Sequence, residues 1–272
     1  MSVLEQIEGW PCEQAAAAVV SPEGVLEARG DHGHEFRWAS VTKLLTTEAL
    51  LVALEEGILD LDQPAGPEGS TIRHLAAHAS GLPLDEGRPI ALPGRKRIYS
   101  NQGIEVLADE IATAAEMAFA EYLRAAVSGP LGLSRHLAGS PASGYRGTLD
   151  DLAALAAELL APRLVAPETL DEAVTVQFPG LSGVVPGFGR QEPNDWGLGF
   201  ELRDAKSPHW TGTRNSPRTF GHFGASGTFL WVDPEAHLAL AVLTDLDFGE
   251  WARDAWPRLA AAVLAEYAGV TE

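Results

Sequence analysis

A helix that is apolar on almost every side is the strongest constraint on this chain. Residues 44–54 read Leu-Leu-Thr-Thr-Glu-Ala-Leu-Leu-Val-Ala-Leu, so apolar or small side chains surround most of a helical circumference. Gly57 follows two glutamates, where a helix C-cap is expected. Such a helix packs against neighbours on several sides. We therefore predict that it lies in the interior of the fold.

Ser40 and Lys43 stand at the start of this helix. Three residues apart, they share a helix face and their side chains can meet. A serine hydroxyl needs an adjacent base to become a good nucleophile. A lysine can be that base only if burial or a nearby positive field lowers its pKa. The N-terminus of a buried helix supplies both conditions, and its free N–H groups can stabilise an oxyanion.

Lysine is rare in this sequence. Only three of the nineteen basic residues are lysines, at positions 43, 96 and 206. An arginine at position 43 would stay charged and could not act as a base, and a buried lysine without a partner is rarely only structural. The pair alone is still a weak motif, so its interpretation depends on partners elsewhere in the chain.

The composition excludes several classes of function. A chain of 272 residues can form one large domain or two closely joined parts, and 46% apolar with 21% charged residues is typical of a soluble globular protein. A net charge of −19 argues against nucleic acid and anionic membrane as partners. Cys12 is the single cysteine, so an intrachain disulfide is excluded. The chain has neither a secretory signal pattern nor an apolar run near 18 residues. We therefore expect a cytoplasmic protein, a monomer or weak dimer.

The two ends of the chain predict strands, and the middle predicts helices. Residues 15–20 and 25–29 indicate a hairpin, and strands at 198–202, 227–232 and 238–243 precede a closing helix at 249–267. The middle predicts a helix capped by Ser70 or Thr71, one capped by Thr148, a long loop at 179–195, and further helices at 102–114, 115–128 and 167–178.

These elements predict an α/β protein of the α+β type. One antiparallel sheet is built from both chain ends and flanked by helices on both faces. Residues 1–65 and 196–272 form this sheet domain, and residues 66–195 form an all-helical domain inserted between them. The active cleft is expected between the two parts.

Other candidate sites carry a weaker signal. His32 with His34, and His74 with His78, have spacings that a metal could use, but solvated or packed histidines are the better interpretation. We therefore predict no metal site and no cofactor. The basic run at 95–97 is either a solvated patch or a contact for an anionic substrate group. Tyr99, Asn101 and His222, each taken alone, are explained by packing, helix capping or a buried strand.

Three motifs in order change that interpretation: Ser40-Val41-Thr42-Lys43, Tyr99-Ser100-Asn101 and His222-Phe223-Gly224. Together they resemble the serine β-lactamase and penicillin-binding superfamily in its class C branch, which includes D-alanyl-D-alanine carboxypeptidases, D-aminopeptidases and family VIII esterases. The stretches 36–39, 78–83 and 224–227 resemble the family as well.

The resemblance implies roles for the matching residues. Ser40 would be the acylated nucleophile and Lys43 the base that takes its proton. Tyr99 would act as general acid and base, favoured as a phenolate by neighbouring positive charge. Asn101 would bind the substrate amide or the Lys43 amine, and His222 would face a substrate carboxylate or Tyr99.

The third motif, which includes Gly224, would line the substrate cleft. The N–H groups of Ser40 and Ala225 would form the oxyanion hole. This motif also departs from the family. Related β-lactamases have Lys-Thr-Gly, and Phe223 removes a hydroxyl that would bind a substrate carboxylate.

The expected function is therefore a serine hydrolase that forms an acyl-enzyme on a small ester or amide. A β-lactamase, or a binding module that keeps the fold without turnover, is the alternative.

Overall fold

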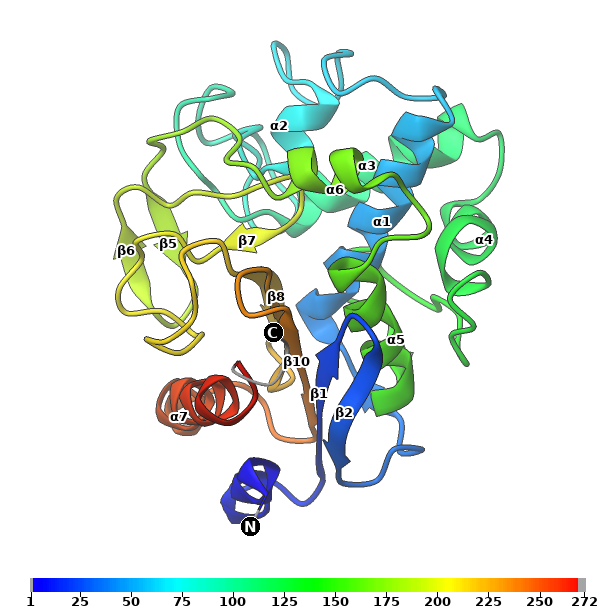
Figure 1. Cartoon of the computed structure of the whole chain (residues 1–272). Helices are drawn as coiled ribbons and strands as arrows, with labels where there is room; N and C mark the ends of the chain where they lie inside the picture. The colour runs from blue at the N-terminus through cyan, green and yellow to red at the C-terminus, as the bar shows by residue number, and fades with distance from the viewer. Residues whose placement is uncertain (1, 269–272) are drawn as a thin grey trace.

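Continuous apolar runs form the central strands of a six-stranded antiparallel sheet in the computed structural model (Figure 1), which describes residues 2–268. The strand order is β2–β1–β10–β9–β8–β7. The N-terminal part supplies β1 (Ala15–Ser21) and β2 (Gly24–Arg29); the C-terminal part supplies β7 (Glu201–Leu202), β8 (Phe220–Gly224), β9 (Thr228–Asp233) and β10 (Leu238–Thr244). Because β1 pairs with β10, the prediction of one sheet from both chain ends is confirmed.

Both faces of the sheet are covered by helices, as predicted (Figure 1). Alternate residues of β1 enter two separate cores: Ala16 and Ala18 face one, and Ala17 and Val19 face the other. Helix α5 (Leu149–Leu160) packs on the first face, and α7 (Glu250–Tyr267) with the 3₁₀ helix η1 (Val3–Gly9) lies on the second. A strand buried on both sides needs no polar alternation, which explains its uniform composition.

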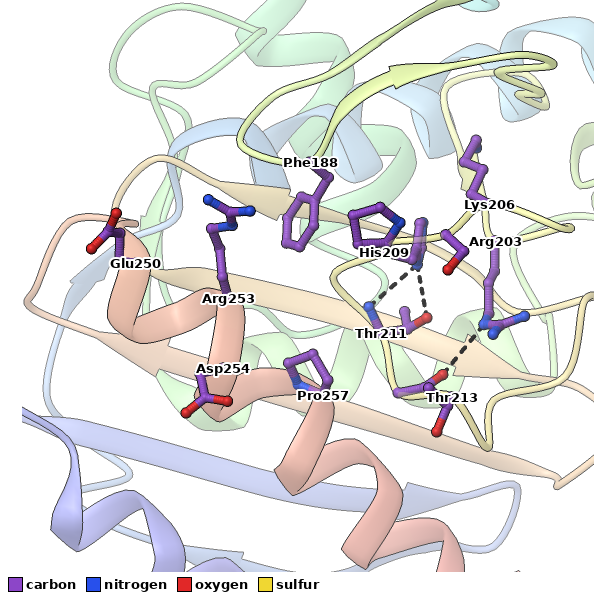
Figure 2. A pocket seen from close by; sticks show the side chains of 13 residues that line it. Phe188, Arg203, Lys206, His209, Thr211, Thr213, Glu250, Arg253, Asp254 and Pro257 are labelled. Atoms are coloured by element: carbon purple, nitrogen blue, oxygen red, sulfur yellow. Dashed lines mark hydrogen bonds between the residues drawn. The ribbon is translucent and has the colours of Figure 1, made fainter.

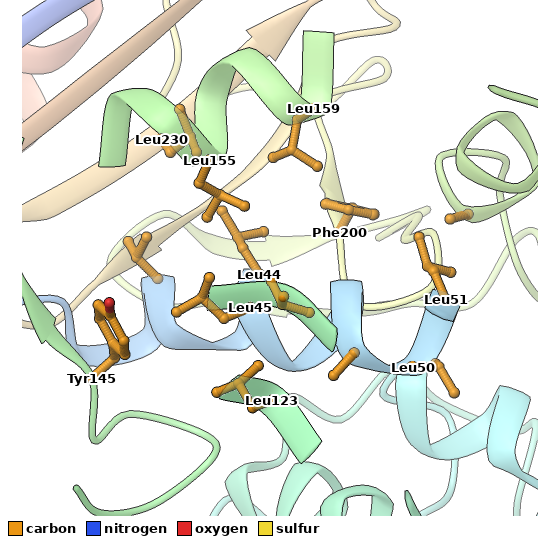
Figure 3. Packing of buried hydrophobic residues seen from close by; sticks show 14 of the residues in the cluster. Leu44, Leu45, Leu50, Leu51, Leu123, Tyr145, Leu155, Leu159, Phe200 and Leu230 are labelled. Carbon is orange, nitrogen blue, oxygen red and sulfur yellow. The ribbon is translucent and has the colours of Figure 1, made fainter. Parts of the chain in front are cut away.

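The apolar helix found in the sequence is α1 (Thr42–Glu55), and it is buried. Figure 3 shows its leucines at positions 44, 45, 50 and 51 in one buried cluster with Leu155 and Leu159 of α5, Leu230 of β9 and Leu123. A 3₁₀ turn, η2 (Ala39–Val41), precedes α1. Ser40 therefore lies on this 3₁₀ turn, two residues before the start of the α-helix that the sequence predicted to hold it.

The middle of the chain contributes α2 (Ile72–Ala76), α3 (Asn101–Ala114), α4 (Phe119–Leu123), a π-helical turn (Arg124–Ser128) and α6 (Pro167–Ala173). The side chain of Thr71 caps α2, that of Ser100 caps α3, and that of Thr148 forms a capping box with Asp151 at α5. The predicted N-caps at Thr71 and Thr148 are thus confirmed.

Several predicted elements are shorter than expected. The helix predicted over 115–128 begins only at Phe119, because Glu116 takes a left-handed φ of 53°. The helix predicted over 167–178 ends at Ala173. The strand predicted over 198–202 reduces to β7, because Gly199 turns at a φ of 70° and its N–H donates to the carbonyl of Ala76.

Short strands also occur where none was predicted. The 179–195 segment contains the hairpin of β5 (Gly183–Val185) and β6 (Gly189–Gln191). A two-residue strand β3 (Phe36–Arg37) pairs with β4 (Arg146–Gly147). The middle segment is therefore mainly helical rather than wholly so, and its helix α5 packs on the sheet. The division at residues 66 and 195 into two domains stays a prediction. No helix within residues 2–268 has the length and apolar character needed to cross a membrane.

Candidate active site

A cleft of about 250 Å³ brings together five of the seven predicted site residues: Ser40, Tyr99, Asn101, His222 and Ala225. The remaining wall is mostly apolar and comes from the 84–101 region, the β5–β6 hairpin and the C-terminal part: Leu84, Val185, Pro186, Trp196, Glu201, Phe223 and Phe248. Residues from distant parts of the sequence thus meet at one apolar opening.

The backbone just before Ser40 is strained. Ala39 has a φ of 45°, a region that residues other than glycine rarely adopt. The Ser226 hydroxyl donates to the Arg37 carbonyl at 2.7 Å, and the Thr228 hydroxyl donates to the Trp38 carbonyl at 2.9 Å. These bonds from the β8–β9 turn hold the strained segment that carries the nucleophile.

Lys43 is fully buried, and no carboxylate among residues 2–268 contacts its amine. Its Nζ lies 3.2 Å from Ser40 Oγ, 2.7 Å from Asn101 Oδ1 and 2.9 Å from the carbonyl of Ala142. Burial lowers the pKa of Lys43 to about 7, against the opposing fields of Glu105 and Asp85. A neutral amine has two N–H donors and one lone pair, so it can donate to Asn101 and Ala142 and accept the proton of Ser40.

Tyr99 lies across the cleft, with its ring centroid 4.8 Å from Lys43 Nζ. Its hydroxyl is buried and meets no partner in hydrogen-bonding geometry among residues 2–268. Burial raises the pKa of Tyr99, and the nearby Ser40 hydroxyl only partly opposes that shift. The family resemblance implied a phenolate; because desolvation outweighs the contribution of the Ser40 hydroxyl, burial instead favours the neutral phenol.

Asn101 links the base to the rim of the cleft. Its Oδ1 accepts from Lys43, and its Nδ2 donates to Asp85 Oδ1 at 3.2 Å. The two bonds together define which side of the amide faces the lysine. Of the two roles that the resemblance implied for Asn101, the structure shows the contact with the Lys43 amine.

His222 is buried and neutral. Burial lowers its pKa to about 3, with a further contribution from Lys43. Its Nδ1 donates to the carbonyl of Phe223 at 2.7 Å, which leaves Nε2 as an unpaired acceptor. Its ring centroid lies 5.7 Å from that of Tyr99. An acceptor cannot pair with a carboxylate, so of the two implied partners only Tyr99 fits.

Gly224 does not line the cleft. A Cβ at this position would lie 2.5 Å from the Trp38 carbonyl and 3.1 Å from Ala39 Cβ, so glycine lets β8 approach the segment before Ser40. Ala225 does line the cleft, and its N–H has no partner in residues 2–268. That N–H is therefore available to an oxyanion.

Sequence reasoning missed several groups in contact with this centre. Ala142 and Asp85 carry no motif, because one acts through its carbonyl and the other sits in an irregular loop. Trp196, whose ring lies 4.7 Å from His78 and 5.6 Å from His222, was considered only as a boundary. The Gly- and Pro-rich 179–195 segment was the available signal for the hairpin wall, since long loops often serve a function.

A larger hollow of about 440 Å³ lies between α7 and the 203–213 segment (Figure 2). Its buried His209 bonds to Thr211 at 2.8 Å and to Glu201 at 2.8 Å, and Lys206 bonds to Glu201 at 2.6 Å. These groups satisfy one another, and both His209 and the Thr211 hydroxyl beside it are buried. No group of three His, Cys, Asp or Glu side chains within residues 2–268 could hold a metal ion. The Ser40 cleft is therefore the candidate active site.

Residues 15–265 match the family model described as β-lactamase. The chain belongs to the β-lactamase family. Proteins of the β-lactamase family are serine hydrolases acting on small esters and amides, which confirms the predicted superfamily and class of enzyme.

Three known proteins are similar to this chain to different degrees. A solved structure described as a β-lactamase from Mycobacterium bovis is 54% identical, with a TM-score of 0.97 over 98% of this chain and 100% of that chain. EstCE1, described as a hydrolase with promiscuous acyltransferase activity, shares the fold at 17% identity and a TM-score of 0.78, over 96% of this chain and 98% of its own. The D-alanyl-D-alanine-carboxypeptidase/endopeptidase AmpH of Escherichia coli is 28% identical over 134 residues, which is 36% of this chain and only 35% of that relative.

Proposed function

We propose that this protein hydrolyses small uncharged esters or amides through an acyl-enzyme on Ser40. The observation that carries the proposal is a fully buried lysine amine, without a carboxylate partner, 3.2 Å from Ser40 Oγ. A pKa of about 7 makes Lys43 partly neutral near neutral pH, where a general base is most effective.

The proposed reaction begins when neutral Lys43 takes the hydroxyl proton of Ser40 and Oγ bonds to the substrate carbonyl carbon. The carbonyl oxygen becomes an oxyanion that accepts from the N–H groups of Ser40 and Ala225. The Tyr99 phenol gives its proton to the leaving group as the ester or amide bond breaks, and the Lys43 ammonium restores the phenol proton. A water then attacks the acyl-enzyme and loses a proton to neutral Lys43. As the bond between the acyl carbon and Oγ breaks, the Lys43 ammonium returns that proton to Ser40 and the acid is released.

The cleft favours a substrate without a carboxylate. Its wall is mostly apolar, His222 offers a neutral acceptor, and Phe223 stands where the related motif has a hydroxyl. An unpaired carboxylate in such a cleft would pay a large desolvation cost. These features support a neutral ester or amide over a carboxylate-bearing peptide.

A β-lactamase is the second candidate, because the protein that is 54% identical to this chain is described as one. A binding module without turnover is the third. Cytoplasmic location, a monomer or weak dimer, and the two-domain division are retained as predictions.

The test compares wild type with Ser40→Ala on nitrophenyl esters, nitrocefin and a D-alanyl-D-alanine peptide, with intact-mass spectrometry of the protein during turnover. We expect ester hydrolysis and an acyl adduct in wild type only, with slower nitrocefin hydrolysis. Faster turnover of nitrocefin than of any ester would establish the second candidate. Thermal stabilisation by these compounds without an adduct or turnover would establish the third.

A further inference from the structure

The amine of Lys43 is surrounded by Ser40 and two other acceptors, and each of those two is itself held by a carboxylate. Asp85 accepts from Asn101 Nδ2 at 3.2 Å, while Asn101 Oδ1 accepts from Lys43 at 2.7 Å. Asp85 lies in the exposed loop after α2, and Asn101 begins α3. The hydrogen bonds thus connect the Asp85 carboxylate, through the Asn101 amide, to the Lys43 amine.

The second arrangement runs through a different loop. Glu105, one turn further along α3, accepts a hydrogen bond from the Ser140 hydroxyl. The same hydroxyl accepts from the N–H of Ala142 at 3.0 Å, and the carbonyl of Ala142 accepts from Lys43 at 2.9 Å. These hydrogen bonds connect the Glu105 carboxylate, through the Ser140 hydroxyl and the backbone of Ala142, to the Lys43 amine.

We propose that Asp85 and Glu105 are positioning residues for the Lys43 base, each fixing one of the two acceptors that orient its lone pair toward Ser40. With Asn101 and Ala142 held in place, the two N–H donors of a neutral amine are committed, and the remaining lone pair faces the hydroxyl. A third group that orients the base is the general logic of an activated nucleophile. The inference extends the proposed function and rests on Lys43 being the base.

The two carboxylates also set the charge balance of the base. They are the acidic groups that favour its protonated form against burial, so they keep the pKa of Lys43 from falling further. The other titratable groups around the amine are His78, His222 and Tyr99. Burial lowers the pKa of both histidines and raises that of Tyr99, so all three are uncharged at neutral pH.

Amide variants separate charge from position. Asp85→Asn and Glu105→Gln keep an oxygen that can accept the same hydrogen bond but remove the negative charge. Glu86→Gln in the same loop and Asp109→Asn on the same helix are matched controls, because neither carboxylate contacts the network. Asp85→Ala and Glu105→Ala remove both the charge and the acceptor.

We expect the acidic limb of the pH profile of kcat/KM for a neutral ester to move down by roughly half to one pH unit in each amide variant, and further in the double variant. The alanine variants should lose roughly a further 5- to 10-fold in kcat, with KM changed little, as expected for a misdirected base. The shift caused by Asp85→Asn should shrink in 1 M salt, because Asp85 is exposed.

A measurement that needs no substrate accompanies the kinetics. With only three lysines in the chain, a protein labelled with ¹³C at lysine Cε gives three side-chain signals, and Lys43→Met identifies one of them. We expect the midpoint of the Lys43 titration to fall in both amide variants and to stay at the wild-type value in the controls.

Alanine variants that keep the kcat of the matching amide variants would overturn the positioning roles. Coincident titrations of the Lys43 signal in the double amide variant and wild type would overturn the effect of the two charges on the base. Equal shifts in the controls would also overturn it, since they would show a general effect of net charge. If ester hydrolysis survives Ser40→Ala, the proposed function fails instead, and the titration of Lys43 in the amide and alanine variants still decides whether the two carboxylates act on its amine.

Discussion

Two of the three lysines in this protein are buried, and the contrast between them shows how a fold assigns different chemistry to the same side chain. Lys43 is 0% exposed and Lys206 is 4% exposed. Each amine meets three acceptors. Those of Lys206 are Glu201 Oε1 at 2.6 Å, the Asp195 carbonyl at 2.7 Å and the Leu202 carbonyl. The essential difference is one carboxylate, which Lys206 has and Lys43 lacks.

The Glu201 carboxylate determines the charge state of the lysine beside it. Burial alone would raise the pKa of Glu201, but its contacts with His209 and Lys206 lower that pKa below its usual value, so Glu201 is anionic. Burial lowers the pKa of Lys206 as well, and Glu201 opposes that shift. Lys206 thus belongs to an ion pair that joins β7 to the 203–213 loop, whereas Lys43 stays available for proton transfer. Four experiments test this difference between the two lysines.

The largest expected effect comes from replacing the base. In Lys43→Arg the guanidinium stays protonated and cannot take the proton of Ser40. We expect kcat/KM for a nitrophenyl ester to fall about 10²- to 10⁴-fold. Lys96→Met, on the exposed basic run, is the control and should keep wild-type activity. Arginine at position 43 with activity within a few-fold of wild type would mean that another group is the base.

The second-largest expected effect is a loss in the free energy of unfolding when Lys206 is replaced. Lys206→Met leaves Glu201 without its lysine in the interior, and breaking a buried ion pair by removing one partner costs about 3–5 kcal/mol. Lys43→Met removes an amine that pairs with no charge, so we expect a much smaller loss in the free energy of unfolding. Urea unfolding of both variants at pH 7.5 compares them directly. Equal losses would show that the two lysines are held in the same way.

Asn101→Asp should give Lys43 a carboxylate partner, as Glu201 is for Lys206. It puts a carboxylate where Oδ1 now lies, 2.7 Å from Lys43 Nζ. A partner at that distance raises a lysine pKa by about 1–3 units. At pH 7 the base would then be protonated and ester hydrolysis would drop, with recovery toward pH 9.

The companion variant Asp85→Asn with Asn101→Asp restores a donor beside the new carboxylate and controls for repulsion between the two acids. A pH profile unchanged from wild type in the double variant would contradict the assignment of Lys43 as the base.

The difference between the two sites also shows what the sequence could predict. The helix of residues 44–54, the pairing of both chain ends and the three motifs depend on local periodicity and short spacings, so Ser40, Lys43, Tyr99, Asn101 and His222 could be proposed before the structure was known. The sheet needed only apolar runs long enough to be buried on both faces.

The partners of the two lysines depend on tertiary contacts without a sequence pattern. Ala142 is 99 residues from Lys43 and contributes only a carbonyl, which any residue type could supply. The neutral state of Tyr99 depends on how completely its hydroxyl is desolvated, and the β5–β6 wall depends on a hairpin of three-residue strands. Glu201 and Lys206 are only five residues apart, yet no motif marks them as a pair.

The smallest effect we predict is a change in stability with pH, and it follows from the charge contrast itself. In the folded protein Lys43 loses its proton near pH 7, whereas an unfolded lysine keeps it to about pH 10.4. Between these values the unfolded state binds more protons, so folding stability due to Lys43 rises with pH and is lost as pH falls toward 7. The free energy of unfolding of wild type relative to Lys43→Met should therefore increase by about 1.4 kcal/mol per pH unit from pH 7.5 to 9. Urea unfolding at matched ionic strength measures that slope, and a flat difference would mean that the amine keeps its proton in the folded protein, as Lys206 does beside Glu201.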